Sequence, residues 1–153
     1  KNEKNLFENL HISSLLHDIG KIGVPERILN KNGLLNEEER EAMKKHPLIG
    51  VDILSRIDEF HAPILGVKYH HEHHDGSGYP EGLKGEKIPL IAQIIAVADT
   101  FDAITTKRPY RRGDGLLNKE EAARLIENEK NKQFNPIIAD AFLNAYKKGK
   151  LQG

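Results

Sequence analysis

The sequence contains no cysteine and no tryptophan, and aromatic residues make up only 6% of its 153 residues. The absence of cysteine excludes disulfide bonds, zinc sites with thiolate ligands and cysteine nucleophiles. The chain also has no excess charge of either sign, because 23 lysines and arginines balance 23 aspartates and glutamates. This balance argues against a protein that binds DNA or an anionic membrane through its overall charge, although it leaves room for a local basic patch.

Long apolar runs are missing as well. No segment approaches the roughly 18 apolar residues of a membrane-spanning helix, so we expect no membrane segment in this chain and a cytoplasmic location. The chain does contain 38% hydrophobic and 30% charged residues, which is typical of a folded domain and not of a disordered segment. We therefore expect residues 1–153 to form one domain with its own hydrophobic core.

Apolar residues recur mostly at helical spacings, and we expect an all-α fold. Asn36 with Glu39, and Asn118 with Glu121, form capping-box patterns at two helix starts. Residues 75–82 are rich in glycine and proline and predict a loop. Residues 90–106 are apolar nearly all round and predict a buried central helix. The other predicted helices cover 6–19, 36–45, a segment that begins near 47, 63–71, a segment that begins at 118, and 136–147.

Adjacent polar side chains stand at the ends of two predicted helices. His17 and Asp18 end the first apolar helix, where they either flank a metal ion or form an ordinary helix end with the histidine near the helix dipole. His70 continues the apolar stripe of its helix, and His71 follows directly. One imidazole in that position is either a core histidine or a ligand, but two adjacent histidines favour a metal or phosphate site.

Asp99 and Asp102 lie on one face of the most apolar predicted helix, and we expect both carboxylates to face inward. An unpaired buried carboxylate is costly, so each must pair with a cation, be protonated or bind a metal. The histidines favour metal coordination for Asp99. For Asp102, an ion pair and metal coordination stay equally open.

A basic run, Lys107-Arg108-Pro109-Tyr110-Arg111-Arg112, follows this helix. The run is either a solvated loop or a clamp for phosphate oxygens, and Lys21 stands close enough to His17 in sequence to serve the same charge. Nitrogen and oxygen ligands without sulfur, beside cationic side chains, together indicate two-metal hydrolysis of a phosphate ester.

Five segments then complete a recognisable pattern: HDIGKIGVP (17–25), MKKHP (43–47), HHEHHDGSGYP (70–80), ADTFDA (98–103) and RPYR (108–111). In order and spacing, over residues 11–146, they resemble the HD-GYP branch of the HD phosphohydrolase superfamily. The resemblance implies a helical bundle around a metal centre, in a bacterial phosphodiesterase that hydrolyses cyclic di-GMP to pGpG and/or GMP.

The same resemblance implies roles for individual residues. The metal ligands would be His17, Asp18, His46, His70, His71 and Asp99, with Asp18 bridging two ions. Asp18 and Lys21 would be catalytic, and the substrate contacts would be Lys21, Tyr79, Asp102, Arg108 and Arg111. Two divalent ions are implied, with a third as an alternative. Fe or Mn is expected, and Ni, Co or Zn are the other candidates.

One departure from the family pattern concerns the start of the chain. The family places a further metal-ligand histidine well upstream of the His17–Asp18 pair, and His11 is a poor substitute because it lies on the same predicted helix. We therefore expect an N-terminally truncated domain that lacks its first helix, and a fuller protein with an upstream sensory or receiver domain.

The resemblance also implies a partner and leaves alternatives open. Through Gly78-Tyr79-Pro80 it implies contacts with diguanylate cyclase (GGDEF) domains, and DNA is not expected as a partner. One alternative is an HD hydrolase of another nucleotide, against which the Asp75–Pro80 loop argues. The other is a non-catalytic module that senses cyclic di-GMP or docks proteins.

Overall fold

The computed structural model describes residues 2–106 and 116–150, and within these ranges every regular element is a helix or a 3₁₀ turn. The predicted all-α class is confirmed. None of the helices in these ranges is long and apolar enough to cross a membrane. In chain order the elements are α1 (Asn2–Leu16), η1 (Ile19–Gly23), α2 (Glu26–Leu29), α3 (Glu37–Met43), α4 (His46–Leu54), η2 (Asp58–Phe60), α5 (Pro63–Tyr69), η3 (Gly85–Lys87), α6 (Leu90–Thr105), α7 (Lys119–Asn128) and α8 (Pro136–Lys147).

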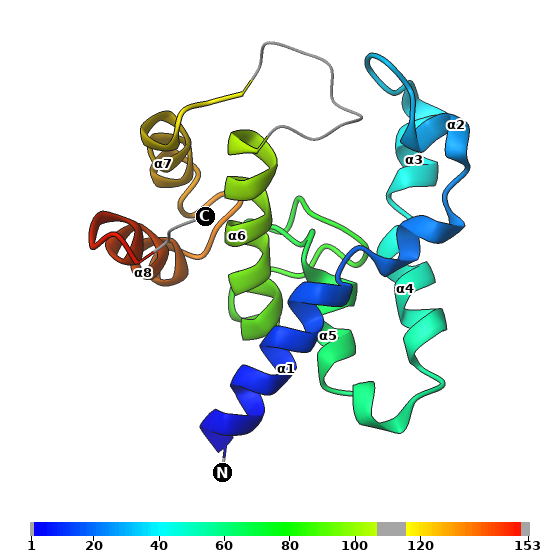
Figure 1. Ribbon diagram of the computed structural model, residues 1–153, viewed down its shortest axis with the longest axis horizontal. Helices are drawn as coiled ribbons and strands as arrows, with labels where there is room; N and C mark the ends of the chain where they lie inside the picture. The colour runs from blue at the N-terminus through cyan, green and yellow to red at the C-terminus, as the bar shows by residue number, and fades with distance from the viewer. Residues whose placement is uncertain (1, 107–115, 151–153) are drawn as a thin grey trace.

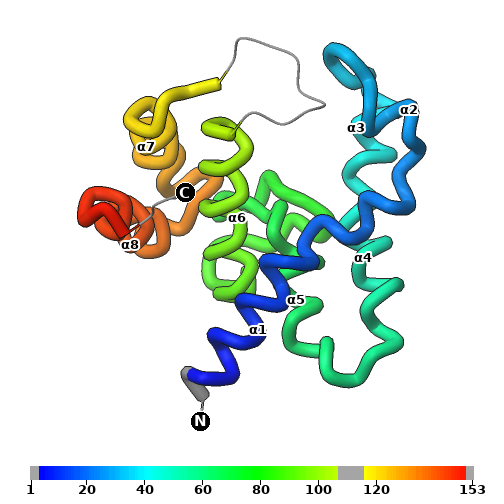
Figure 2. The backbone as a smooth tube through the Cα atoms, in the orientation of Figure 1, coloured from blue at the N-terminus to red at the C-terminus, as the bar shows by residue number. Residues whose placement is uncertain are grey.

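Helix α6 runs through the middle of the molecule, between α1 and α5 on one side and α7 and α8 on the other (Figures 1 and 2). This arrangement confirms the predicted central position of the helix, but only part of the helix is buried. Helices α2, α3 and α4 form a separate arm, which joins the rest through α5 and through η1. The buried residues of α6 lie in its first half: Ile91, Ala92, Ile95, Ala96 and Val97.

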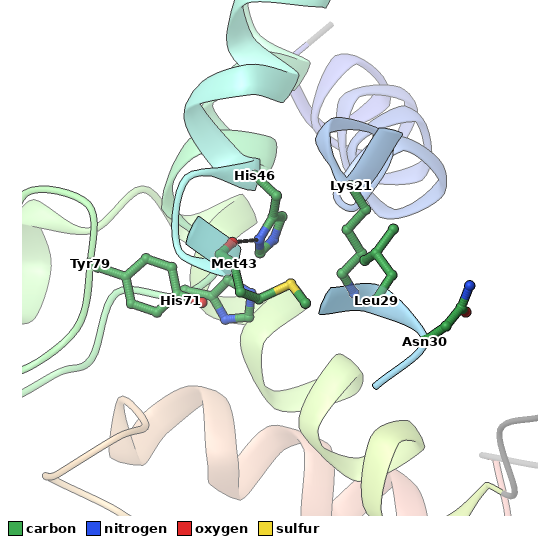
Figure 3. Close-up of a pocket in the computed structure, with 7 residues that line it drawn as sticks. All are labelled: Lys21, Leu29, Asn30, Met43, His46, His71 and Tyr79. Carbon is green, nitrogen blue, oxygen red and sulfur yellow. Dashed lines mark hydrogen bonds between the residues drawn. The ribbon is translucent and has the colours of Figure 1, made fainter. Parts of the chain in front are cut away.

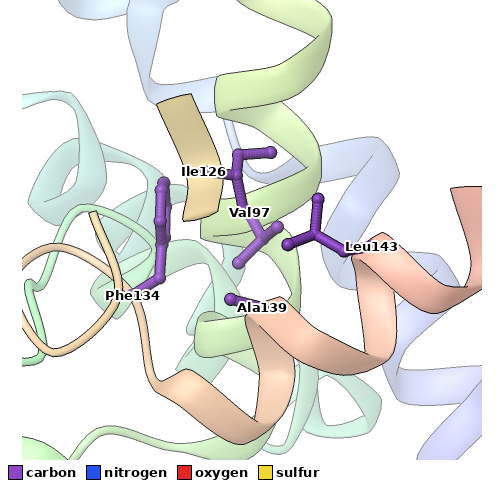
Figure 4. Close-up of a cluster of buried hydrophobic side chains, with 5 residues drawn as sticks. All are labelled: Val97, Ile126, Phe134, Ala139 and Leu143. Carbon is purple, nitrogen blue, oxygen red and sulfur yellow. The ribbon is translucent and has the colours of Figure 1, made fainter. Parts of the chain in front are cut away.

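Two hydrophobic clusters hold the helices together. The first joins α6, α7 and α8 and consists of Val97, Ile126, Phe134, Ala139 and Leu143 (Figure 4). The second joins α4 to α5 and consists of Leu54, Ile64 and Val67. Full burial of such a side chain contributes about 1.5–3 kcal/mol. The second cluster therefore fixes the helices that precede or carry the candidate histidines.

The helix starts that local sequence predicts are present. Asn36 at the start of α3 and Asn118 at the start of α7 each form a complete capping box with the glutamate three residues later. Helix α8 begins at Pro136, and the side chain of Asn135 accepts a hydrogen bond from the backbone N–H of Ile137. These bonds satisfy amide groups that a helix start leaves unpaired, which is why the local pattern is sufficient to predict them.

The first helix ends earlier than predicted, at Leu16 instead of Ile19. His17 and Asp18 form a turn, and η1 follows. The chain leaves helical geometry here because η1 packs directly against α4: a Cβ atom on Gly20 would collide with backbone atoms of His46 and Gly50. Only glycine permits so close an approach of two backbones. The early end of α1 brings His17 and Asp18 next to α4.

We predict that Gly20→Ala lowers the free energy of unfolding by about 3 kcal/mol, because the added methyl group meets backbone atoms that cannot rotate away. Urea unfolding of the wild type and the variant measures the difference. Gly23→Ala is the matched control, since its methyl group would meet only the side chain of Ile49. That variant should lose less than about 1 kcal/mol. Equal losses in the two variants would contradict the assigned contact.

Candidate metal centre

Side chains from separate segments converge between α4 and α5. Asp18 follows α1, His46 is the first residue of α4, and His70 and His71 follow α5. One ligand atom of each residue lies within 4.8 Å of the corresponding atoms of the others. His46 is 1% exposed and His70 is 2% exposed, so bulk water does not compete strongly for these nitrogen atoms.

Backbone carbonyl groups set the direction of the imidazole rings. Nδ1 of His46 and Nδ1 of His70 each lie 2.8 Å from the carbonyl oxygen three residues earlier. His17 makes the same contact over 2.7 Å. Because a carbonyl oxygen only accepts, each Nδ1 carries the proton and donates it. The Nε2 atoms therefore present lone pairs, which is the form of imidazole that binds metals.

The lone pairs of His46 and His70 face each other, with 3.4 Å between the Nε2 atoms. Two acceptors at this distance repel each other unless a cation or a proton lies between them. Burial lowers the pKa of His46, and burial together with the charges of His17 and His46 lowers the pKa of His70. Burial likewise lowers the pKa of His71. An added proton is therefore disfavoured, and a metal cation fits this arrangement better.

Asp18 lies between two groups of ligand atoms. Its Oδ1 is 3.4 Å from Nε2 of His46, and its Oδ2 is 3.5 Å from Nε2 of His17. On the far side, Oδ1 of Asp99 is 3.6 Å from the same His17 nitrogen. One carboxylate thus faces the buried histidines with one oxygen and the His17–Asp99 pair with the other. This is the placement of a carboxylate that can bridge two ions.

The His17 side of the site also fits a cation. Nε2 of His17 is buried and makes no hydrogen bond to the described part of the chain. Burial acts to lower the pKa of His17, but Asp99, Asp18 and the hydrogen bond to the Ser14 carbonyl together outweigh burial, and the net pKa is raised. A buried nitrogen that lacks a hydrogen bond, with a carboxylate on either side, favours a positive species at this point.

A cavity of about 490 Å³ lies beside the histidines (Figure 3). Tyr79 stacks on His71, with 4.8 Å between the ring centroids and 24° between the planes. Burial, then the charges of Asp18 and Asp99, raise the pKa of Tyr79, so its hydroxyl stays protonated and can donate a hydrogen bond. The lining combines a cation, an amide, an aromatic ring and apolar side chains: Lys21, Leu29, Asn30, Met43, His46, His71 and Tyr79.

A second cavity, of about 430 Å³, lies on the other side of Asp18, between α1 and α6. Asp99 and Asp102 both line it, but Asp102 is exposed and accepts a hydrogen bond from the Thr106 hydroxyl over 2.8 Å. The expectation that both carboxylates face inward is wrong for Asp102. The fully buried residues of α6 end at Val97. Phe101 still packs on the first hydrophobic cluster, but Asp102 borders the second cavity.

Some sequence predictions lie outside what the structure describes, and some site residues have no sequence signal. Arg108 and Arg111 lie in the segment 107–115, outside the described residues. Conversely, sequence analysis assigns no role to the cavity residues Leu29, Asn30 and Met43 or to the buried Glu72. Leu29 and Asn30 come from a segment without candidate ligands, while Met43 and Glu72 adjoin candidate ligands but carry no ligand role of their own. Only the packing of α2 and α3 against the site brings Leu29, Asn30 and Met43 to the cavity.

An all-helical bundle with a buried cluster of histidine and aspartate ligands defines a class of helical metal-binding domains. The family described as HD domain matches residues 1–138. The chain belongs to this family, and the predicted recognition of an HD-GYP domain of the HD superfamily is confirmed by the match together with the relatives.

Curated relatives carry related names. A cyclic di-GMP phosphodiesterase of Thermotoga maritima is 48% identical over 143 residues, which cover 90% of this chain and 37% of the relative. The 3′3′-cGAMP-specific phosphodiesterase 3 of Vibrio cholerae is 44% identical over 127 residues, covering 83% of this chain and 27% of the relative. The chain therefore spans well under half the length of these relatives.

A solved structure supports the fold. The crystal structure of a cyclic GMP-AMP-specific phosphodiesterase of V. cholerae superposes with a TM-score of 0.70 at 20% sequence identity. The superposition covers 95% of this chain and 39% of that chain. At this identity the similarity shows the helical architecture.

We predict that Mn(II) raises the melting temperature of the metal-stripped protein and that His70→Gln removes most of this shift. An ion that binds only the folded state stabilises it by about 2.7 kcal/mol at a hundredfold excess over its dissociation constant. Differential scanning fluorimetry with elemental analysis measures both effects. His73→Gln is the control, since His73 lies outside the group and its Nδ1 contacts the Ser77 hydroxyl at 3.0 Å. An undiminished shift in His70→Gln would show that the ion binds elsewhere.

Proposed function

We propose that this protein is a metal-dependent phosphodiesterase that hydrolyses cyclic di-GMP to pGpG and/or GMP. One observation carries the proposal: Asp18 lies between two groups of nitrogen and oxygen ligands, with Lys21 and a cavity of about 490 Å³ beside them. The family match and a relative named cyclic di-GMP phosphodiesterase support the same function.

The metal content is part of this proposal. One ion would be held by His17, Asp18 and Asp99, and a second by Asp18, His46, His70 and His71. We propose Fe or Mn at these positions, with Ni, Co or Zn as alternatives, and a third ion as an alternative stoichiometry. When bound, such ions polarise a phosphoryl oxygen and lower the pKa of a water molecule to the neutral range.

The chain's own residues supply positioning and charge. Lys21 forms an ion pair with Asp18 and lines the cavity, so its ammonium group can neutralise negative charge on phosphate oxygens. Tyr79 offers a ring and a protonated hydroxyl to the substrate. Asp102 would accept from a hydroxyl or base N–H group at the second cavity, while Arg108 and Arg111 would hold a neighbouring phosphate.

We keep two alternative functions, of which only the first has an observation in its favour. The relative named 3′3′-cGAMP-specific phosphodiesterase is 44% identical to this chain, which favours 3′3′-cGAMP as a second candidate substrate. A non-catalytic module is less well supported, because the candidate ligands in the described part of the chain all surround Asp18. His46, His70 and His71 lie on one side of it, and His17 and Asp99 lie on the other. Docking of GGDEF domains on Gly78-Tyr79-Pro80, an upstream sensory or receiver domain, and a cytoplasmic location stay predictions.

The function is tested by anaerobic turnover of cyclic di-GMP, 3′3′-cGAMP and a cyclic mononucleotide by Fe(II)- or Mn(II)-loaded protein, followed by chromatography. We expect cyclic di-GMP to give pGpG or GMP.

Asp18→Ala should lose bound metal and turnover together, because it removes oxygen ligands from both groups. Asp52→Ala is the control, since Asp52 is an exposed carboxylate on α4. Preferred cleavage of another substrate would overturn the choice of cyclic di-GMP. Binding without cleavage would favour the module.

We predict that Lys21→Met lowers kcat about 100-fold while the metal content stays unchanged, because the lysine stabilises charge and is not a ligand. Elemental analysis and steady-state kinetics check the two parts separately. Lys45→Met provides the control, since Lys45 is exposed and lies outside both cavities. If Lys21→Met lost metal and rate in proportion, the role of Lys21 would be to hold Asp18 in place.

A further inference from the structure

Glu72 carries a buried carboxylate that the proposed chemistry does not use. The residue is 2% exposed. Its Oε1 accepts hydrogen bonds from the backbone N–H groups of Glu81 and Gly82 over 2.8 and 3.1 Å, and its Oε2 accepts one from Leu83 over 2.9 Å. Removing a carboxylate from water is costly unless its oxygens are satisfied, and these backbone bonds satisfy both oxygens.

The bonds of Glu72 close the loop that carries Tyr79. The loop leaves His71, turns and comes back, so that the N–H of Tyr79 donates to the carbonyl oxygen of His71 over 3.1 Å. At Gly78 the returning part of the loop lies against its own beginning, so closely that a Cβ atom on Gly78 would collide with the backbone of Glu72 and His73. Glu72 binds the residues just beyond Tyr79, and the loop is thus held on both sides of the ring.

The contact between Tyr79 and His71 depends on this closure. The two rings stack with 4.8 Å between centroids, and Tyr79 forms one wall of the cavity of about 490 Å³. Two of the metal-facing imidazoles are oriented without the loop, because Nδ1 of His46 and Nδ1 of His70 donate to the carbonyl oxygens of Met43 and Val67. The wall and these two ligands are therefore supported by different hydrogen bonds, whereas the ring of His71 contacts Tyr79 itself.

We propose that Glu72 is a positioning residue that holds Tyr79 against the cavity, and that it thereby sets affinity for a large cyclic dinucleotide without setting metal affinity. The inference rests on the proposed function and names a residue that acts through Tyr79. A substrate large enough to fill the cavity needs the wall that Tyr79 forms. A small phosphodiester that reaches only the metal centre does not.

The test compares Glu72→Gln with Glu86→Gln in the metal-loaded protein. Glutamine keeps the shape of the side chain but removes the negative charge and turns an N–H group toward backbone donors. Glu86 is an exposed glutamate in the adjacent η3 and is the matched control. For Glu72→Gln we expect faster hydrogen exchange at the amides of residues 81–83 and loss of the nuclear Overhauser contact between the Tyr79 and His71 rings.

In kinetics, Glu72→Gln should raise KM for cyclic di-GMP about tenfold, in line with the loss of one charge-assisted bond. Its dissociation constant for Mn(II) and its turnover of bis(p-nitrophenyl) phosphate should match the wild type. Glu86→Gln should match the wild type in every readout. Loss of Mn(II) binding, or an equal fall with both substrates, would overturn the proposal because Glu72 would then support the metal centre.

The proposal has a readout that does not depend on activity. If the ring contact and the protection of amides 81–83 persist in Glu72→Gln, the positioning role is wrong whatever the kinetics show. If the wild type cleaves no cyclic dinucleotide, the proposed function fails, while the amide exchange and the ring contact still decide whether Glu72 holds the loop. A folded Glu72→Ala variant, checked by circular dichroism, should show the same loss of the ring contact in stronger form.

Discussion

The metal centre depends on hydrogen bonds in which Nδ1 of His17, His46 and His70 each donates to a carbonyl oxygen three residues earlier. The three acceptors lie in the last turns of helices: Ser14 in α1, Met43 in α3 and Val67 in α5. A helix end leaves such carbonyl groups without an intrahelical donor. The position four residues after Met43 is a proline, which has no N–H group to offer. The histidines thus supply donors to carbonyl groups at three helix ends, and the same hydrogen bonds direct their Nε2 lone pairs toward the site.

Asp18 connects the imidazoles on its two sides, and it can do so because it lies in a turn after α1 and not in a helix. If the helix continued, the side chains of His17 and Asp18 would point about 100° apart around its axis. Instead η1 packs on α4 through Gly20, and Asp18 faces His46 with one oxygen and His17 with the other. The close backbone contact at Gly20 is therefore part of the construction of the site as well as of the fold.

Sequence predicted the features that depend on local chemistry. The capping boxes at Asn36 and Asn118 and the start of α8 are determined within a few residues, and the structure confirms them. The end of α1 was predicted too late because the constraint comes from α4, which is distant in sequence. Asp102 was expected to be buried because periodicity reports a face of a helix but not where the packing against that face ends. The loop contacts of Glu72 could not be predicted from sequence, because every residue except proline has a backbone N–H group and the sequence does not show which of these groups a carboxylate will meet.

Chemistry and ligand selection are carried by different parts of this fold. The candidate metal ligands stand at helix ends in the packed centre, where His46 and His70 are almost fully buried. The rest of the large cavity is lined by Leu29 and Asn30 near the end of α2, by Met43 of α3 and by Tyr79. Cavity residues on the arm and the loop can change without altering the hydrogen bonds that aim the imidazoles. A single HD scaffold can therefore keep one metal centre while its cavity is adapted to different phosphodiesters, which is consistent with relatives named for cyclic di-GMP and for 3′3′-cGAMP.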